Sequence, residues 1–157
     1  LTLFLLLLFV NSCTGYQPIF NQKNLNFKII DFSIEGSEQL GKRIYSRLEN
    51  LSKTTKNNQG ATGIILNIKI TKEKVATTKD SAGKILEYKI NLNFQSNASN
   101  YLTNNTLLNK SFTISGTYKV QDQHSETIQI ENKLITDLMD RAYEDLVINL
   151  SEGLLNE

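Results

Sequence analysis

The chain has 157 residues, a net charge of +1 at pH 7, one cysteine, one proline and no tryptophan. A single cysteine cannot form an internal disulfide, which excludes a disulfide-stapled scaffold. The composition is that of an ordinary globular protein apart from abundant Asn, Lys and Ile. We assign no glycosylation to the Asn-x-Ser/Thr triplets, because abundant Asn produces them by composition alone.

The chain opens with an apolar segment, Leu1–Val10, followed by Asn11, Ser12 and the single cysteine, Cys13. An apolar core of this length before a small residue is typical of a secretory signal peptide. It is too short to span a bilayer, which needs about 20 apolar residues. The arrangement resembles a bacterial lipobox, in which the cysteine is lipidated and becomes the new N-terminus. A plain signal peptide or an uncleaved anchor, with an incidental Cys13, is the alternative.

Lipidation of Cys13 predicts three segments. Residues 1–12 are a lipoprotein signal peptide truncated at its N-terminal side, residues 13–26 are the lipidated cysteine and an extended tether, and residues 27–157 are a single domain. Two or more acyl chains hold a protein stably at a membrane. The residue after the cysteine is Thr14 rather than aspartate, which by resemblance to bacterial lipoproteins is compatible with the outer membrane. We therefore expect a lipid-anchored protein at the periplasmic face of the outer membrane.

The domain begins with a strand and a helix. Alternation over residues 27–34 predicts a strand. Ser37 is expected to be the N-cap of a helix that ends near Lys53. Apolar residues recur along this helix at spacings of four and three, which indicates one buried stripe. The residues expected to be buried are Ile30, Phe32 and Ile34 in the strand and Leu40, Ile44, Leu48 and Leu51 in the helix.

Three later segments alternate cleanly between apolar and polar residues. Such alternation predicts strands of an antiparallel sheet that is covered on one face only. Gly116 falls at an apolar position, which indicates either a bulge or the close approach of a helix. The expected strands are 64–71, 86–94 and 112–120, separated by a turn at Asp80–Gly83 and by a polar loop from Gln95 to Thr106.

A long helix is expected from about Ser125 to Ser151. The order β-α-β-β-β-α predicts an α+β fold, a two-layer sandwich in which two helices cover one face of a four-stranded, mostly antiparallel sheet. The residues of its apolar stripe are Ile128, Ile135, Leu138, Ala142, Leu146 and Leu150.

Charge is divided unevenly along the chain. From Asp122 onward there are nine carboxylates and two basic residues, whereas residues 13–121 carry fifteen basic and seven acidic residues. Strand register places Lys69, Lys89 and Lys119 on the polar face of the sheet, beside amides and hydroxyls. This mixture of groups suits sugars and phosphates, so these three lysines are the candidate ligand contacts. Lysines that merely keep an exposed sheet soluble are the alternative.

The sequence contains no pattern typical of catalysis. His124 is the only histidine and has no evident partner that would orient it as a base. There is no Cys/His spacing typical of a metal site, no Gly-rich phosphate loop and no serine in a nucleophile elbow. We therefore expect a binding or assembly component and not an enzyme, with no metal and no cofactor. The carboxylates of the last helix, which suit a solvated helix face, are Asp137, Asp140, Glu144 and Asp145.

The segment Gly15–Phe20 behind Cys13 resembles the mature start of the lipopolysaccharide-assembly lipoprotein family (LptE), especially its alphaproteobacterial branch. There the mature chain begins with cysteine, glycine, an aromatic residue, any residue, proline, an aliphatic residue and an aromatic residue. Here Thr14 is inserted between the cysteine and the glycine. The element order and the long last helix, which contains Ala142–Leu146, extend the resemblance over the mature chain.

The resemblance implies a non-enzymatic plug and assembly partner of an outer-membrane β-barrel, the LptD-like translocon protein that exports lipopolysaccharide. The implied partners are this barrel, lipopolysaccharide and the membrane through the lipid anchor; no nucleic acid is expected. Large barrels have polar, water-filled lumens, so a plug needs a polar exterior. Another periplasmic envelope lipoprotein of similar layout, such as a peptidoglycan-synthase activator or an auxiliary transport component, is the alternative.

Overall fold

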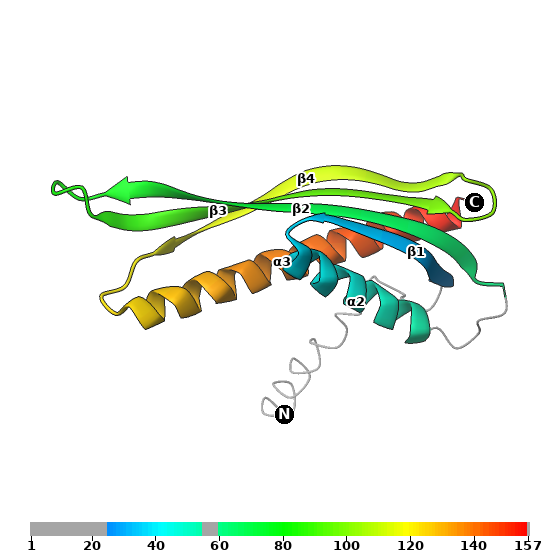
Figure 1. The fold of residues 1–157 in the computed structure, drawn as a ribbon, viewed down its shortest axis with the longest axis horizontal. Coiled ribbons are helices and arrows are strands. Elements are labelled where there is room, and N and C mark those ends of the chain that lie inside the picture. The colour runs from blue at the N-terminus through cyan, green and yellow to red at the C-terminus, as the bar shows by residue number, and fades with distance from the viewer. Residues whose placement is uncertain (1–24, 55–59, 157) are drawn as a thin grey trace, which may run out of the picture.

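The computed structural model describes residues 25–54 and 60–156. Cys13, the predicted signal peptide and most of the predicted tether lie outside these residues. The predicted element order and the α+β class are confirmed (Figure 1). The elements are β1 (Phe27–Gly36), α2 (Glu38–Thr54), β2 (Thr62–Lys79), β3 (Ile85–Asn100), β4 (Thr106–Lys119) and α3 (His124–Leu155).

The four strands form one open sheet in the order β1-β2-β3-β4. The strands β1 and β2, which α2 connects, are parallel, whereas β3 pairs antiparallel with both β2 and β4. Both helices lie on one face of this sheet and leave the other face open (Figure 1). Because β1 pairs with β2 only as far as Ile70, the β2–β3 hairpin projects beyond β1 and α2 (Figure 1).

The core lies between the sheet and the two helices. Every second residue of β2 from Ile64 to Ile70 is almost fully buried, as the alternation predicts. Burying one such side chain contributes roughly 1.5–3 kcal/mol, so a strand register shifted by one residue would be strongly disfavoured. The buried residues that the helices contribute include Leu40, Ile44, Leu48, Ile135, Leu138, Met139, Ala142, Leu146 and Leu150.

The predicted apolar stripe of α3 is wrong at its N-terminal end. Ile128 is 44% exposed, whereas Thr127 is buried. The Thr127 Oγ1 accepts a hydrogen bond from the Gln121 N–H at 2.9 Å, which joins the helix start to the chain that precedes it. Glu131 takes the next inward position and hydrogen-bonds to the sheet. Because polar residues occupy the inward positions here, apolar periodicity alone misplaces the buried stripe.

The polar loop predicted from Gln95 to Thr106 is also wrong, because most of this segment belongs to the sheet. Strand β3 continues to Asn100 and β4 begins at Thr106. The positions that face the helices in this part of β3 are Ser96, Ala98 and Asn100, all of them buried. Small and polar residues at core positions hide the alternation, so no apolar signal marks the second half of this strand.

Strand β1 differs from its predicted pattern because of a bulge. Its pairing with β2 shifts between Ile29 and Asp31, and Ile30 is 45% exposed. Phe32 is 47% exposed and stacks on the Tyr45 ring of α2 at a centroid distance of 4.0 Å. The prediction that Ile30, Phe32 and Ile34 are all buried is therefore wrong. The bulge places Ile30 off the covered face, whereas Phe32 and Ile34 lie against α2 but remain partly exposed.

Gly116 marks the close approach of a helix. A Cβ atom added at this position would lie 2.6 Å from the Leu134 Cδ1 of α3. The pairing of Gly116 with Ile90 continues without a register shift, so the alternative of a bulge is wrong. Absence of a side chain here lets α3 pack directly against β4.

Candidate functional site: the open face of the sheet

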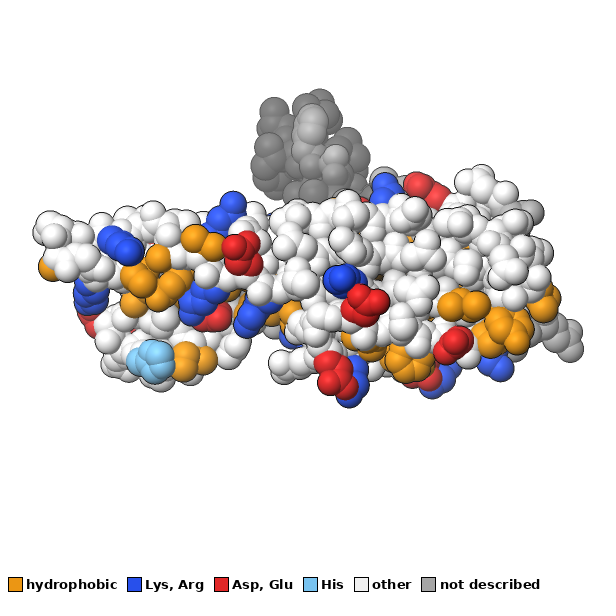
Figure 2. Space-filling view, turned by 45° about the horizontal axis from the view of Figure 1, so that its top comes forward, with side chains coloured by type: hydrophobic (Ala, Val, Ile, Leu, Met, Phe, Trp, Pro, Cys, Tyr) orange, Lys and Arg blue, Asp and Glu red, His pale blue; other side chains and the backbone are white. Residues whose placement is uncertain are grey.

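The open face of the sheet carries rows of polar side chains that run across neighbouring strands. Residues that are paired in register point to the same face, so the pairing defines each row. Figure 2 shows the wide half of this face as mainly white, the colour of uncharged polar side chains and backbone. The two longest rows are Ser33–Asn67–Asn97–Asn109 and Glu35–Lys69–Gln95–Ser111.

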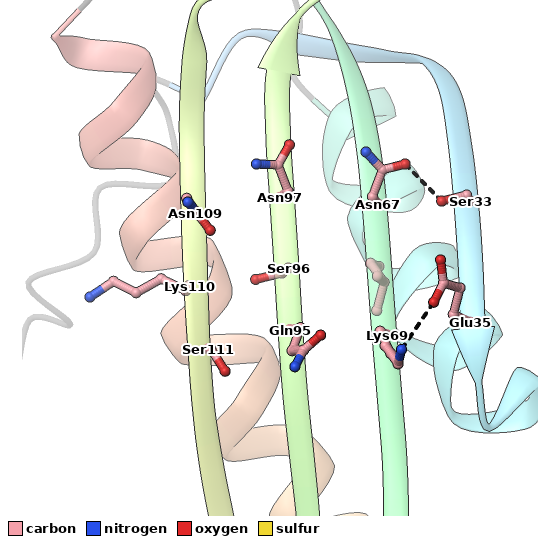
Figure 3. Close-up of a pocket in the computed structure, with 11 residues that line it drawn as sticks. Ser33, Glu35, Asn67, Lys69, Gln95, Ser96, Asn97, Asn109, Lys110 and Ser111 are labelled. Atoms are coloured by element: carbon pink, nitrogen blue, oxygen red, sulfur yellow. Dashed lines mark hydrogen bonds and ion pairs between the residues drawn. The ribbon is translucent and has the colours of Figure 1, made fainter.

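These two rows line a depression of about 330 Å³, which we call the sheet depression. Figure 3 shows their amide and hydroxyl groups facing outward from all four strands. The Ser33 hydroxyl donates a hydrogen bond to Asn67 Oδ1 at 2.7 Å, and Lys69 Nζ forms an ion pair with Glu35 Oε2 at 3.3 Å. The lining residues are Ser33, Glu35, Asn67, Ile68, Lys69, Gln95, Ser96, Asn97, Asn109, Lys110 and Ser111.

Several of the lining side chains have hydrogen-bonding groups to spare. Within the residues that the structure describes, the side chains of Gln95, Asn97, Asn109 and Ser111 form no hydrogen bond to protein. Each amide offers donors and an acceptor, and the hydroxyl offers both. The depression is therefore chemically equipped to bind a polar ligand that itself carries both donors and acceptors.

The three predicted lysines all lie on the open face, but the structure brings only two of them together. Lys69 lies in the sheet depression, beside Gln95 of β3. Lys89 lies six residues from Gln95 along β3, a separation of roughly 20 Å. Lys119 pairs with Glu87 and is thus a diagonal neighbour of Lys89, at roughly 7–8 Å between Cβ atoms.

Lys89, which is half-buried, and Lys119, which is exposed, form a pair of cations at the start of the projecting hairpin. Among the described residues, neither lysine forms a salt bridge. Glu87 lies opposite Lys119, and its carboxylate accepts a hydrogen bond from the Thr77 hydroxyl at 2.8 Å but forms no ion pair with Lys119. Figure 2 shows that Lys and Arg side chains gather over this hairpin. The pair is therefore the part of the open face that best suits an anionic group.

A charged cluster on the covered face was missed by sequence reasoning. Lys74 Nζ lies 2.6 Å from Glu131 Oε2, and the Tyr118 hydroxyl donates to the same oxygen at 2.6 Å. Lys74 also lies 4.3 Å from the centre of the Tyr88 ring. The available signal was that Lys74 falls at a core-facing position in the alternation of β2. Through these contacts the cluster connects the N-terminal half of α3 to β2 and β4.

This cluster shifts the pKa values of its members. Burial disfavours both charged groups, yet their mutual hydrogen bond and those with Tyr118 outweigh it, so the pKa of Glu131 is lowered and the pKa of Lys74 is raised. Burial and the hydrogen bond to Glu131 raise the pKa of Tyr118. All three shifts favour the protonation states that hold the cluster together at neutral pH.

Replacing Glu131 by Gln is expected to lower the free energy of unfolding at neutral pH by about 1–2 kcal/mol. Hydrogen bonds to charged groups contribute about 1.5–3 kcal/mol, and solvent screening reduces this because Lys74 is partly exposed. The lowered pKa of Glu131 stabilises the folded state above the ordinary pKa of 4.5, and this contribution is lost as the pH falls through the folded-state pKa. Urea unfolding at neutral and acid pH should therefore show a difference from wild type that shrinks in acid.

The exposed pair of Lys53 with Glu49 supplies the control for this measurement. Glu49→Gln should change the free energy of unfolding by less than about 0.5 kcal/mol, since surface ion pairs contribute little. An equal effect of Glu131→Gln and Glu49→Gln would show that the cluster does not hold α3.

The acidic residues of α3 take part in ordinary surface contacts. Asp140 forms an ion pair with Arg47 of α2 at 2.6 Å, and the Arg47 guanidinium lies 3.8 Å from the centre of the Tyr143 ring. Asp137 pairs with Lys133 on the same helix. His124 is exposed at the first residue of α3. In residues 25–54 and 60–156 no group of His, Cys, Asp and Glu could hold a metal ion, and no helix is long and apolar enough to cross a membrane.

Comparison with solved structures shows which known proteins share the fold of this chain. No protein-family model matches the chain, and no curated protein matches it. Rare lipoprotein B from Shewanella oneidensis is 13% identical, with a TM-score of 0.56 over 80% of this chain and 97% of that chain. Lipoprotein B from Nitrosomonas europaea is 14% identical, with a TM-score of 0.60 over 85% of this chain and 90% of that chain. A minor lipoprotein from Acinetobacter baumannii is 15% identical, with a TM-score of 0.55 over 81% and 92%. The chain therefore has the fold of these lipoproteins.

Proposed function

We propose that this chain is a lipid-anchored lipoprotein of the outer membrane that acts as plug and assembly partner of the LptD-like β-barrel that exports lipopolysaccharide. Three features support the proposal. The chain starts with a lipobox-like segment ending at Cys13. The segment Gly15–Phe20 resembles the mature start of the lipopolysaccharide-assembly lipoproteins. The fold is that of rare lipoprotein B.

The observation that carries the proposal is the open polar face of the sheet. A sheet covered on one side by two helices leaves the other side to solvent or to a partner. Here that side presents cross-strand rows of amides and hydroxyls, including Ser33–Asn67–Asn97–Asn109. Such a row carries no charge, so it can form hydrogen bonds to the polar wall of a water-filled barrel without burying an unpaired charge. It has no arrangement suited to catalysis, and the proposal includes no reaction.

Lysines on the same face are the proposed contacts for lipopolysaccharide. Lys89 and Lys119 are free to bind its phosphate groups, since ammonium groups bind phosphate through charge-assisted hydrogen bonds. Lys69 contacts the same molecule from within the sheet depression, where Glu35 neutralises its charge. Anionic groups are therefore assigned to the hairpin end of the face.

Affinity purification from envelope membranes tests the proposal. The full chain carries a tag behind Glu157, and the proteins that co-purify with it are identified by mass spectrometry. Recovery of a large translocon barrel together with lipopolysaccharide is the expected result. Recovery of a penicillin-binding protein without such a barrel would contradict the proposal and favour a peptidoglycan-synthase activator.

The double variant Lys89→Glu/Lys119→Glu is expected to weaken binding of lipopolysaccharide by roughly tenfold or more, because attraction at two phosphate contacts becomes repulsion. The affinity of the purified protein for lipopolysaccharide is measured in detergent. The matched control is Lys42→Glu/Lys53→Glu, which changes the net charge equally but lies on the exposed surface of α2. Equal affinities of the two double variants would exclude a specific role for Lys89 and Lys119.

A further inference from the structure

The sheet depression is electrically neutral where it faces solvent. The two charged side chains that point into the depression, those of Glu35 and Lys69, form an ion pair with each other. Figure 3 shows the Lys110 side chain extending past β4 and away from the depression. An anionic or cationic ligand would therefore find no uncompensated partner charge here, in contrast to Lys89 and Lys119, which form no salt bridge among the described residues.

The amides of the depression differ from other amides on the same face. Asn91 donates a hydrogen bond to Glu73, and Asn93 donates to Thr71 and accepts from Thr113. Gln95 and Asn97, on the next two positions of the same face of β3, form no side-chain hydrogen bond to described residues. Amide side chains on this face are therefore hydrogen-bonded to neighbouring side chains outside the depression, and they are available to a ligand inside it.

Available amides and hydroxyls in a neutral depression match the chemistry of a sugar. A sugar ring presents neighbouring hydroxyls, and each of them both donates and accepts hydrogen bonds, as Asn and Gln side chains do. The volume of about 330 Å³ is at the lower end of the range of roughly 300–1,000 Å³ for small-molecule sites, which suits a mono- or disaccharide. No aromatic ring lines the depression, so we expect weak binding, in the millimolar range.

We infer that the sheet depression binds a neutral hexose unit of a lipid-linked glycan. This rests on the proposed function, because that function supplies the glycan and places its phosphates on Lys89 and Lys119. Gln95 and Asn97 are the central ligand contacts, since each lies between two other lining residues in its cross-strand row. The open face then carries two subsites, one neutral and one cationic, roughly 20 Å apart along β3.

Saturation-transfer difference NMR tests the inference with maltose as the probe. The full chain is solubilised in a detergent that has no sugar headgroup. Maltose is expected to receive saturation from the wild-type protein, with a dissociation constant in the millimolar range. Asn97→Leu is expected to weaken this binding by roughly tenfold, because it removes both hydrogen-bonding groups at the centre of the depression. Gln95→Leu, at an exposed position, carries the same expectation if Asn97→Leu does not fold.

Two controls make the result specific. Asn91→Leu changes the same residue type on the same strand but outside the depression, and maltose binding should be unchanged. Lys89→Glu/Lys119→Glu should also leave maltose binding unchanged. Absence of saturation transfer to maltose, or equal affinity of wild type and Asn97→Leu, would overturn the inference. Binding of the acetamido disaccharide chitobiose but not of maltose would overturn it as well, and would indicate a cell-wall glycan.

The maltose-binding test of the sugar subsite and the affinity purification that tests the proposed function can fail independently. Recovery of the barrel with the tagged wild-type chain, together with no maltose binding by wild type, would refute the sugar subsite alone. Maltose binding that depends on Asn97, together with no barrel in the purification, would refute the translocon partnership alone.

Discussion

Replacement of Cys13 by Ser is expected to move the protein from the membrane fraction to the soluble fraction. Acyl chains contribute roughly 0.8 kcal/mol per buried methylene group, and two or more chains are needed for stable anchoring. Serine cannot form the thioether through which a lipoprotein cysteine is modified, so the variant would lose the whole anchor.

Fractionation of envelopes, followed by intact mass spectrometry, measures this effect. Wild type should lack residues 1–12 and carry lipid on the Cys13 sulfur, whereas Thr14→Ser, the neighbouring control, should remain lipidated and membrane-bound. A membrane-bound Cys13→Ser variant, or wild type with a free thiol and an intact leader, would remove the lipid anchor and with it the outer-membrane assignment.

Gly36→Ala is expected to be among the most destabilising single substitutions in the described residues. Gly36 has a φ of +77°, and a Cβ atom there would overlap the backbone carbonyl oxygen of Ile70. The same carbonyl accepts a hydrogen bond from the Ser37 N–H at 2.7 Å, which fixes the turn from β1 into α2. Left-handed strain of roughly 1–2 kcal/mol and overpacking of roughly 1–3 kcal/mol predict a total loss of about 2–5 kcal/mol.

Gly83 provides a matched control for this substitution. Its φ is +83°, but no atom lies within 4 Å of a Cβ added there. Gly83→Ala should therefore show the conformational strain alone, about 1–2 kcal/mol in the free energy of unfolding. Denaturant unfolding of both variants isolates the cost of the close approach to Ile70. Equal losses at the two positions would show that the β1–α2 turn can move away from β2.

The unequal roles of the two ends of the open face follow from where its charges are paired. At the wide end Lys69 is neutralised by Glu35, which lies beside it on β1. At the hairpin end β1 no longer runs beside β2, and the carboxylates of Glu73 and Glu87 accept hydrogen bonds from Asn91 and Thr77 instead of forming ion pairs with Lys89 or Lys119. The same polar sheet face therefore offers available amides and hydroxyls at one end and two lysines without ion-pair partners at the other.

The sequence by itself determined the element order, the covered face of the sheet and the place of the candidate lysines. Period-two alternation from Ile64 to Ile70 and from Ile90 to Phe94 specifies which side chains are buried, whereas Leu86, at the start of the β3 pattern, is 40% exposed. A register shifted by one residue would expose all of these side chains, so the local alternation is enough to define the buried face of each strand. The position of Lys69, Lys89 and Lys119 on the open face follows from the same alternation.

Tertiary structure alone decided features that depend on partners far away in the chain. Ser96, Ala98 and Asn100 are buried because α3 and the neighbouring strands cover them, although their own composition indicates a loop. The bulge at Ile30 depends on pairing with β2, and the inward position of Glu131 depends on Lys74, 57 residues earlier. Neutralisation of Lys69 needs Glu35 from another strand. Each of these contacts joins residues that local periodicity cannot relate, because periodicity reports a residue's own face and not what lies opposite it.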